Sequence, residues 1–510
     1  MRRICTLILA AGLVFGAVTG ASAIDFNAKG QWLMGFAGGE HGLLSQTRDA
    51  GAQKQKVNNG DNFRAAQRVR LQLDAVASEA LSGTVYFEIG TQNWGVASQG
   101  GALGADGTNQ IKVKRAYIDW AVPDTDAKVR MGIQGVTMPN AAGGSAVMDT
   151  DVAGVTAAYQ FNENVGLTAL WARPINDNFV NNRPGYTREH TGYLDNIDLF
   201  SLMLPLTFEG VKATPWAMYG MIGRNALKTT WDGTQWDSPS TADGNLPYSL
   251  RPYPALGATN AGIGSTNKQY VGAFWAGLPV QLTLWDPLNI EIDVNYGWTE
   301  GMGRFDYSNR QGFVRRGSTE RQGWLAKGLV EYKMDWATPG VFGWYASGDI
   351  GNPKDGSQRM PSLVPMGNFT SYLGDGNYGW MLQDYGVDYA GTWGVGAQLK
   401  DLSFVENLSH TFRAAYWGGT NSPSMVKYMD SAYSWNDGLG GGTGPYLTTN
   451  DGLVEFNLVN SYKMYENFDV NLEGDYIVNC MDNSTWKKAH GGSFEKQDMW
   501  KVQATFAYSF

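Results

Sequence analysis

Arginines recur on one side of alternating stretches of this sequence. Arg64, Arg68 and Arg70 share one parity of FRAAQRVRLQLDAVAS, and Arg115 and Arg130 lie on the polar side of two later alternating stretches. Alternate residues of a β-strand point to one face. Guanidinium groups gathered on one wet face would place fixed charge there and bias the ions that pass it. Any water-facing strand carries some charge, but three arginines of one parity within seven residues exceed that background.

Acidic residues occupy the polar side of other stretches. In NIEIDVNYGW, for example, Ile290, Ile292 and Val294 alternate with acidic residues. The predicted acidic residues of this face are Glu291, Asp293, Glu455, Glu473 and Asp475. Charged residues on one side of several alternating stretches predict strands that each have one face toward water.

The residue types needed for catalysis or for a metal centre are sparse. The 4 histidines are scattered, without the spacing of a zinc site. The glycine-rich stretch GLGGGTG at 438–444 lacks the Lys-Ser/Thr of a phosphate-binding loop and is interpreted as a loop tip. Asp149 and Asp151 alone would make a weak calcium site. We expect no enzyme activity, no cofactor and no metal.

The N-terminus predicts export. Arg2 and Arg3 precede an apolar stretch and Ala21-Ser22-Ala23, which is the pattern of a cleaved signal peptide over residues 1–23. Residues 24–510 then form the mature chain, which offers no stretch of ~18 apolar residues for a transmembrane helix. Its single cysteine, Cys480, excludes an intrachain disulfide. The net charge of −9 argues against a nucleic-acid partner.

Composition and connection lengths indicate the fold. The chain has 66 glycines, 19 tryptophans, 25 tyrosines and 21 phenylalanines, and only 17% charged residues. Period-2 strands recur throughout, joined alternately by short turns such as PDTDAK and by long Gly-rich loops such as 136–151. This pattern predicts an all-β, antiparallel, up-and-down transmembrane β-barrel, with 18 strands favoured. Because Pro205, Pro215 and Pro279 fall inside three proposed strands, 16 strands remain the alternative.

The C-terminus supports the same fold. In VQATFAYSF, residues 502–510, Val502, Phe506 and Phe510 share one face of a strand, and the chain ends on the aromatic residue. A closing strand must pair with the first strand to remove both sheet edges. Aromatic residues beside turns and loops predict two interfacial girdles.

This terminal strand resembles that of Gram-negative outer-membrane proteins, and the whole mature chain resembles trimeric porins. The nearest resemblance is to the long homotrimeric porins of sulfate-reducing bacteria. The resemblance implies that Phe510 belongs to the signal read by the barrel-assembly machinery. It also implies a homotrimer in the outer membrane. It further implies that the third long loop, 136–151, folds into the pore and brings Asp149 and Asp151 opposite the arginines.

The function expected from these features is passive diffusion of small hydrophilic solutes and ions. Two alternatives remain open: a substrate-selective channel, and a structural or adhesive surface barrel with a plugged lumen. The partner expected in either case is the lipid bilayer of the outer membrane.

Overall fold

A computed structural model provides the structure of the chain. It describes residues 24–39, 44–50, 53–56, 63–96, 111–176, 194, 196–223, 226, 230–231, 236–237, 258–261, 268–301, 304–308, 314–367, 369–371, 389–428, 446–490 and 494–510. The expected signal peptide, residues 1–23, lies outside the described residues and stays a prediction.

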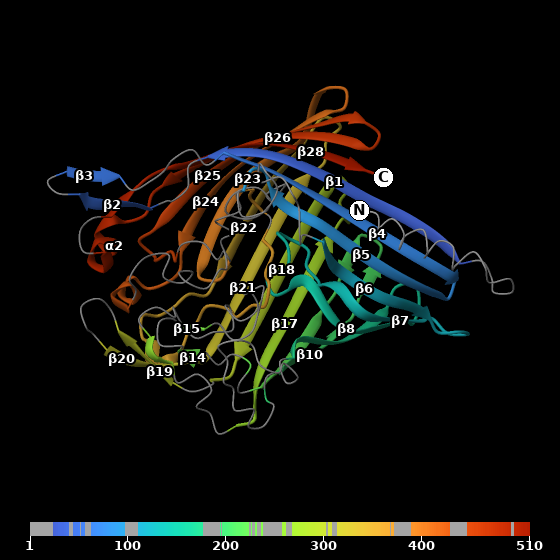
Figure 1. Cartoon of the computed structure of the whole chain (residues 1–510), viewed down its shortest axis with the longest axis horizontal. Helices are drawn as coiled ribbons and strands as arrows, with labels where there is room; N and C mark the ends of the chain where they lie inside the picture. The colour runs from blue at the N-terminus through green and yellow to red at the C-terminus, as the bar shows by residue number, and fades with distance from the viewer. Residues whose placement is uncertain are drawn as a thin grey trace.

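One large antiparallel sheet dominates the fold (Figure 1). Its elements are β1 (Asp25–Gly39), β4 (Arg64–Ser78), β5 (Leu81–Asn93), β6 (Ile111–Ala121), β7 (Ala127–Thr137), β8 (Asp149–Gln160), β9 (Gly166–Asn176), β10 (Asn196–Met203), β11 (Leu206–Phe208), β12 (Val211–Ala213), β13 (Trp216–Gly223), β17 (Tyr270–Leu282), β18 (Leu288–Thr299), β21 (Arg321–Tyr332), β22 (Thr338–Ala346), β23 (Thr392–Val405), β24 (Leu408–Gly419), β25 (Gly452–Tyr465), β26 (Phe468–Asn479) and β28 (Met499–Ser509).

The sheet closes into a barrel of 18 strands. β1 pairs with β4 on one side and with β28 on the other, so the sheet has no free edge. Its 20 elements make 18 strands because β10 with β11, and β12 with β13, are each one strand interrupted next to Pro205 or Pro215. Pro279 lies inside β17 with its side chain buried. The prediction of 18 strands is confirmed, and the 16-strand alternative is wrong.

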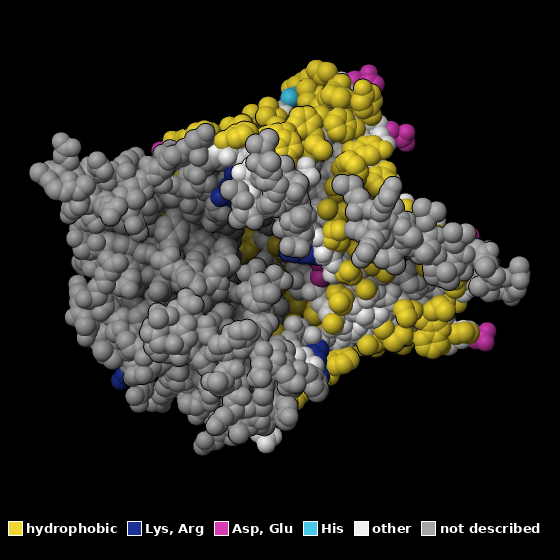
Figure 2. All heavy atoms as spheres, in the orientation of Figure 1, with side chains coloured by type: hydrophobic (Ala, Val, Ile, Leu, Met, Phe, Trp, Pro, Cys, Tyr) yellow, Lys and Arg dark blue, Asp and Glu magenta, His cyan; other side chains and the backbone are white. Residues whose placement is uncertain are grey.

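The two faces of the strands differ as the alternation predicts. In β28, Gln503, Thr505 and Ala507 are buried, whereas Val502 and Tyr508 are exposed. Figure 2 shows hydrophobic side chains over the outside of the described strands and charged side chains inside a central hollow. An apolar outside around a polar inside is the arrangement of outer-membrane barrels. The protein is therefore a transmembrane barrel of the outer membrane.

Exposed aromatic side chains collect near both ends of the strands. Trp120, Phe161 and Tyr508 lie beside short turns, and Trp94 and Tyr345 lie beside long loops. Such belts match the two membrane–water interfaces. They show that the wall between them is the part embedded in lipid.

Smaller elements lie in the long connections. They are β2 (Leu44–Ala50), β3 (Gln53–Lys56), β14 (Thr230–Trp231), β15 (Trp236–Asp237), β16 (Ala258–Ala261), β19 (Arg304–Ser308), β20 (Val314–Ser318), β27 (Phe494–Lys496), the 3₁₀ helices η3 (Pro353–Asp355) and η4 (Pro423–Tyr428), and the α-helix α2 (Asn483–His490). Among the described residues, no helix combines the length and apolar character needed to cross a membrane.

Candidate functional site

The loop between β7 and β8, residues 138–148, contacts the opposite side of the barrel. Lys327 on β21 donates hydrogen bonds to the carbonyl oxygens of Gly143, at 3.3 Å, and Gly144. The indole of Trp216 on β13 donates to the carbonyl oxygen of Pro139 at 3.1 Å. These partners are inward-facing residues of the wall, so the described part of this loop lies across the lumen.

A second connection, residues 347–371 between β22 and β23, packs onto the first loop. Val364 forms a bridge with Met148, and the backbone N–H of Leu363 donates to Val147 O at 2.8 Å. Trp275 on β17 donates to Pro361 O at 2.9 Å. The two connections together fill the lumen beside β13, β17, β18 and β21.

Charged side chains line the inner face of β4, β5 and β6. Arg70 Nε lies 2.8 Å from Glu88 Oε2, and Lys114 Nζ lies 3.7 Å from the same oxygen. Lys114 also reaches Asp151 Oδ2 at 3.2 Å, and Arg115 Nε reaches Asp151 Oδ1 at 2.6 Å. A register shift in β6 at these two residues lets both neighbours reach one carboxylate although they are adjacent in sequence.

The other predicted basic residues lie on the same wall. Arg68 and Arg64 share the inward parity of β4 with Arg70, and Arg64 is exposed near the loop end. Arg130 on β7 binds Asp119 through two hydrogen bonds, at 2.6 and 2.8 Å, and its guanidinium lies 4.1 Å from the ring centre of Tyr117. All five predicted arginines are therefore brought onto neighbouring strands.

The predicted acidic residues of β18, β25 and β26 have a different environment. Asp293, Glu455, Glu473 and Asp475 are buried, and Glu291 is half-buried. Asp293 Oδ2 lies 3.4 Å from Lys327 Nζ, and both side chains are fully buried. These residues are inward-facing, but the packed loops shield the buried ones from water.

A second buried ion cluster lies near the closing strands. Lys501 Nζ on β28 lies 3.4 Å from Glu473 Oε1 and 2.9 Å from Asp475 Oδ2. Gln503 donates to the other oxygen of Glu473 at 2.8 Å. Buried carboxylates need such partners, because an unpaired buried charge is strongly destabilising.

Asp149 and Asp151 lie at the start of β8. Asp151 belongs to the ion cluster described above, whereas Asp149 is exposed and accepts a hydrogen bond from the hydroxyl of Thr137 at 2.8 Å. Asp151 therefore contacts Lys114 and Arg115 directly. It does not face the arginines across an open pore, as the resemblance to porins implied.

The arginine side chains of β4, β6 and β7, here called the arginine wall, are more exposed than the carboxylates of β26. The side chains of Arg70, Arg115 and Arg130 are 29%, 41% and 39% exposed, whereas those of Glu473 and Asp475 are at most 1% exposed. On β4 to β8, Arg70 and Arg115 are more exposed than their partners Glu88 and Asp151, whereas Asp119 is as exposed as Arg130.

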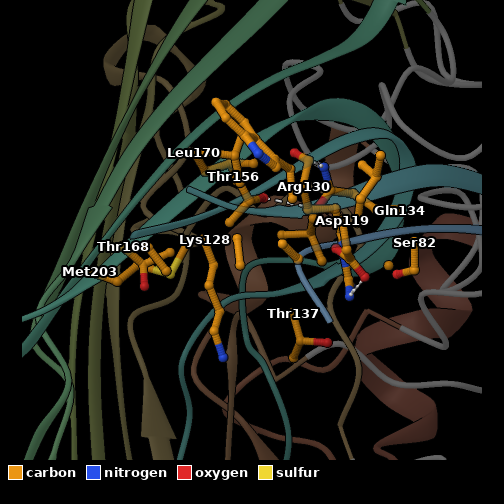
Figure 3. A pocket seen from close by; sticks show the side chains of 18 of the residues that line it. Ser82, Asp119, Lys128, Arg130, Gln134, Thr137, Thr156, Thr168, Leu170 and Met203 are labelled. Atoms are coloured by element: carbon orange, nitrogen blue, oxygen red, sulfur yellow. Dashed lines mark hydrogen bonds and ion pairs between the residues drawn. The ribbon is translucent and has the colours of Figure 1, made fainter. Parts of the chain in front are cut away.

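A cavity of 560 Å³ lies against this wall, between the short turns and the β7–β8 hairpin (Figure 3). Arg130 and Asp119 face each other in it, and Gln134 accepts a hydrogen bond from Thr156 at 2.9 Å. Leu170 supplies an apolar side. Its volume is in the range of small-molecule sites.

Sequence reasoning missed the cations that hold the acidic residues. Lys327 lies in the middle of β21 and Lys501 near the start of β28, and both have the inward parity of their strands. Because a buried acidic side chain needs a partner, an inward-facing lysine on a neighbouring strand could have been predicted to pair with it. Within the described residues no group of three or more His, Cys, Asp or Glu side chains could hold a metal ion.

Comparison with known proteins gives remote structural similarity only. No protein-family model matches the chain, and no curated protein matches it in sequence. OccK1 (OpdK) of Pseudomonas aeruginosa is 11% identical, with a TM-score of 0.47 over 95% of this chain and 98% of that one. The BenF-like porin of Pseudomonas fluorescens Pf-5 is 9% identical, with a TM-score of 0.46 over 95% and 99%. The barrel described above rests on its own strand pairing.

Proposed function

We propose that the protein is an outer-membrane porin through which small hydrophilic solutes and ions diffuse passively. The observation that carries this proposal is a closed 18-strand barrel whose inner wall keeps partly exposed charged side chains on β4 to β7. Barrels of this size are wide enough to hold an aqueous channel. Charged side chains that remain in contact with water are what such a channel requires.

We propose that the path follows the arginine wall and favours anions. Arg64, Arg68, Arg70, Arg115 and Arg130 are its expected pore-lining basic residues. The buried acidic residues, Glu455, Glu473 and Asp475 among them, contribute less to selectivity because they are paired and shielded. The loop 138–148 acts as the constriction on the opposite side of this path.

The packed loops also support the narrower alternative, a substrate-selective channel. Two connections that fill part of the lumen reduce the cross-section that remains, and the 560 Å³ cavity offers both charge and apolar surface to a bound solute. A selective channel shows conductance block that saturates with one class of solute. A plugged structural barrel shows no conductance.

Three more specific statements about the assembly and the relatives of the protein also belong to the porin proposal. They are the homotrimer, the relation to the porins of sulfate-reducing bacteria, and recognition of Phe510 by the barrel-assembly machinery. Their support is the resemblance of the sequence and the terminal strand. The mass of the purified protein in several non-denaturing detergents tests the trimer, and a strictly monomeric mass would contradict it.

Single-channel recording in planar bilayers tests the function. We expect stepwise conductance that does not saturate with salt and a reversal potential displaced toward anions in a salt gradient. Absence of steps from protein shown to be folded by its heat-modifiable mobility would favour the plugged barrel. Saturating block by one solute class would favour the selective channel.

A further inference from the structure

The barrel wall contains a seam where two neighbouring strands are not hydrogen-bonded. Pairing between β6 and β7 runs from Ala121 with Lys128 to Ala116 with Ile133 and ends there. Beyond it, residues 111–115 of β6 and 134–137 of β7 remain strand but pair only with β5 and β8 respectively. The seam is therefore bordered by five residues of β6 and four of β7, and four strand residues span roughly 13 Å.

The local sequence explains why the strands separate. Gly132 has φ +131°, and a Cβ there would collide with the backbone oxygen of Ala116, so only glycine lets β7 approach β6 so closely at the foot of the seam. Above it, Gln134 and Val136 are buried, and the hairpin continues into the loop 138–148 that crosses the lumen. The β7–β8 hairpin therefore leans inward and leaves β6 behind.

The seam lies at the depth of the hydrocarbon. Ile111 and Val113 on its β6 side are 66% and 51% exposed, and Ile133 at its foot is 40% exposed. Ile111 pairs with Ile89 of β5, and Ile89 precedes the interfacial Trp94, the residue just after the end of β5, by five positions. Unpaired backbone groups at this depth are tolerated only where they line water or are covered by protein.

Side chains bridge the seam where backbone bonds are absent. Arg115 and Lys114 of β6 both bind Asp151 of β8. A Cβ at Gly135 would lie 2.5 Å from Arg115 Cζ, so the guanidinium passes directly over the β7 backbone. Lys112, also on β6, is exposed and has no ion-pair partner in the described part of the chain.

We propose that this seam is a water-filled lateral slit of the barrel, and that it holds the head group of an anionic amphiphile whose tail lies in the bilayer. Charge complementarity argues for the occupant: the four cations around the slit, Arg70, Lys112, Lys114 and Arg115, outnumber the three carboxylates Glu88, Asp149 and Asp151. The apolar side chains at its outer rim suit an alkyl chain. This inference rests on membrane insertion of the barrel and stands whether or not the barrel conducts.

Site-directed spin labelling tests the slit. In a Cys480→Ser background, nitroxides at Val113→Cys and Val85→Cys both face outward, but Val85 lies on β5, which pairs on both sides. In liposomes, oxygen should relax both labels, whereas a water-soluble nickel chelate should reach only the label at 113. If oxygen but not the nickel chelate relaxes the label at 113, the wall is closed there and the proposal is overturned.

Fluorescence quenching tests the occupant. A bimane at Val113→Cys is titrated with a brominated dodecanoate, with a brominated alkylammonium of the same length, and with brominated phosphatidylglycerol. Anionic probes should quench at about tenfold lower concentration than the cation, because they gain charge-assisted hydrogen bonds. The stronger of the two anionic probes identifies a free amphiphile or a lipid as the source. Lys112→Gln with Lys114→Gln should abolish the difference, and equal quenching by anion and cation would overturn the proposal.

Discussion

Phe510 and Gly30 face each other across the closing strands. The N–H of Gly30 donates to Phe510 O at 2.9 Å, and the N–H of Phe510 donates to Gly30 O at 3.1 Å. A Cβ on Gly30 would lie 2.7 Å from Phe510 Cζ, so the terminal ring covers this glycine. The last residue thus completes both the hydrogen-bond ladder and the outer surface of the barrel. Closure of this kind removes the two sheet edges.

The first prediction concerns assembly. Deleting Phe510 removes the ring and both hydrogen bonds, whereas Phe510→Ala keeps the bonds and removes the ring. We expect both variants to lower the amount of heat-modifiable barrel in the outer membrane far more than the amount synthesised. If only the deletion does so, the pairing matters and the aromatic signal does not. Normal levels after the deletion would contradict the prediction.

The second prediction concerns ion selectivity. At ~4 Å in a dielectric of ~20, a unit charge is worth about 4 kcal/mol, several times thermal energy. Replacing Arg68 and Arg70 by glutamate should shift the reversal potential toward cations. Screening at physiological salt acts over ~8 Å and shortens as salt rises, so the shift should shrink at molar salt. Alanine replacements should give a smaller shift in the same direction.

The control for this experiment reverses charge outside the barrel sheet. Lys54 and Lys56 lie on β3, in the connection between β1 and β4. Lys54→Glu with Lys56→Glu should change selectivity little. If these variants shift the reversal potential as much as the arginine variants do, the arginines do not line the path.

The third prediction concerns the buried cluster at Lys501. Lys501→Met leaves Glu473 and Asp475 buried without their cation, which costs about 3–5 kcal/mol in comparable pairs. We expect the temperature of the heat-induced mobility shift to fall. Adding Glu473→Gln should recover part of the loss. The matched control is Lys29→Met: Lys29 is 65% exposed and lies 3.9 Å from Asp74, so its loss should have little effect.

The fourth prediction concerns acid. Asp482 precedes α2 and accepts hydrogen bonds from Thr485 and Ser484, which lower the pKa of its carboxyl to about 2. Because this pKa is below the unfolded value of about 4, the stabilisation is complete above about pH 4 and is lost as pH falls through about 2. A nitroxide at Lys487→Cys in the Cys480→Ser background should gain mobility over this range.

Asp482→Asn separates this effect from that of a neighbour. Asparagine still caps a helix but does not titrate, so the label should no longer respond between about pH 4 and 2. Burial raises the pKa of Asp451, whose carboxylate accepts from the N–H of Asp482, so Asp451 takes up its proton at a higher pH. An unchanged acid response in Asp482→Asn would assign the transition to another group.

The strand pattern could be predicted because it depends on local chemistry. Water on one side and lipid on the other select polar and apolar residues alternately, so the parity of Arg68 or Val85 is visible in a few neighbouring residues. Pro205 and Pro215 fell inside two proposed strands, and the structure interrupts these strands next to them, between β10 and β11 and between β12 and β13. Strand number followed from the alternation of short and long connections.

The filling of the lumen could not be predicted in the same way. The contact of Lys327 with Gly143 joins a strand of the wall to the loop that crosses the lumen, and it follows no sequence period. The burial of Asp293 depends on that contact. Strand parity alone therefore predicted that Asp293 faces water, whereas the structure buries it in an ion pair with Lys327. The bulge that places Lys114 and Arg115 together is likewise a tertiary feature.

The last prediction concerns the loop that crosses the lumen. Gly143 has φ +60°, and a Cβ there would lie 2.6 Å from the ring of Phe369 in the second packed connection. Gly143→Val should therefore push the two loops apart and raise single-channel conductance. Gly95 also has a positive φ, +79°, but a Cβ there would meet nothing within 4 Å. Gly95→Val carries the backbone strain without the collision and should leave conductance unchanged. Adding Phe369→Ala to Gly143→Val removes the ring and should return conductance toward the original value. Equal effects of the two glycine variants would show that strain, and not the contact with Phe369, controls the channel.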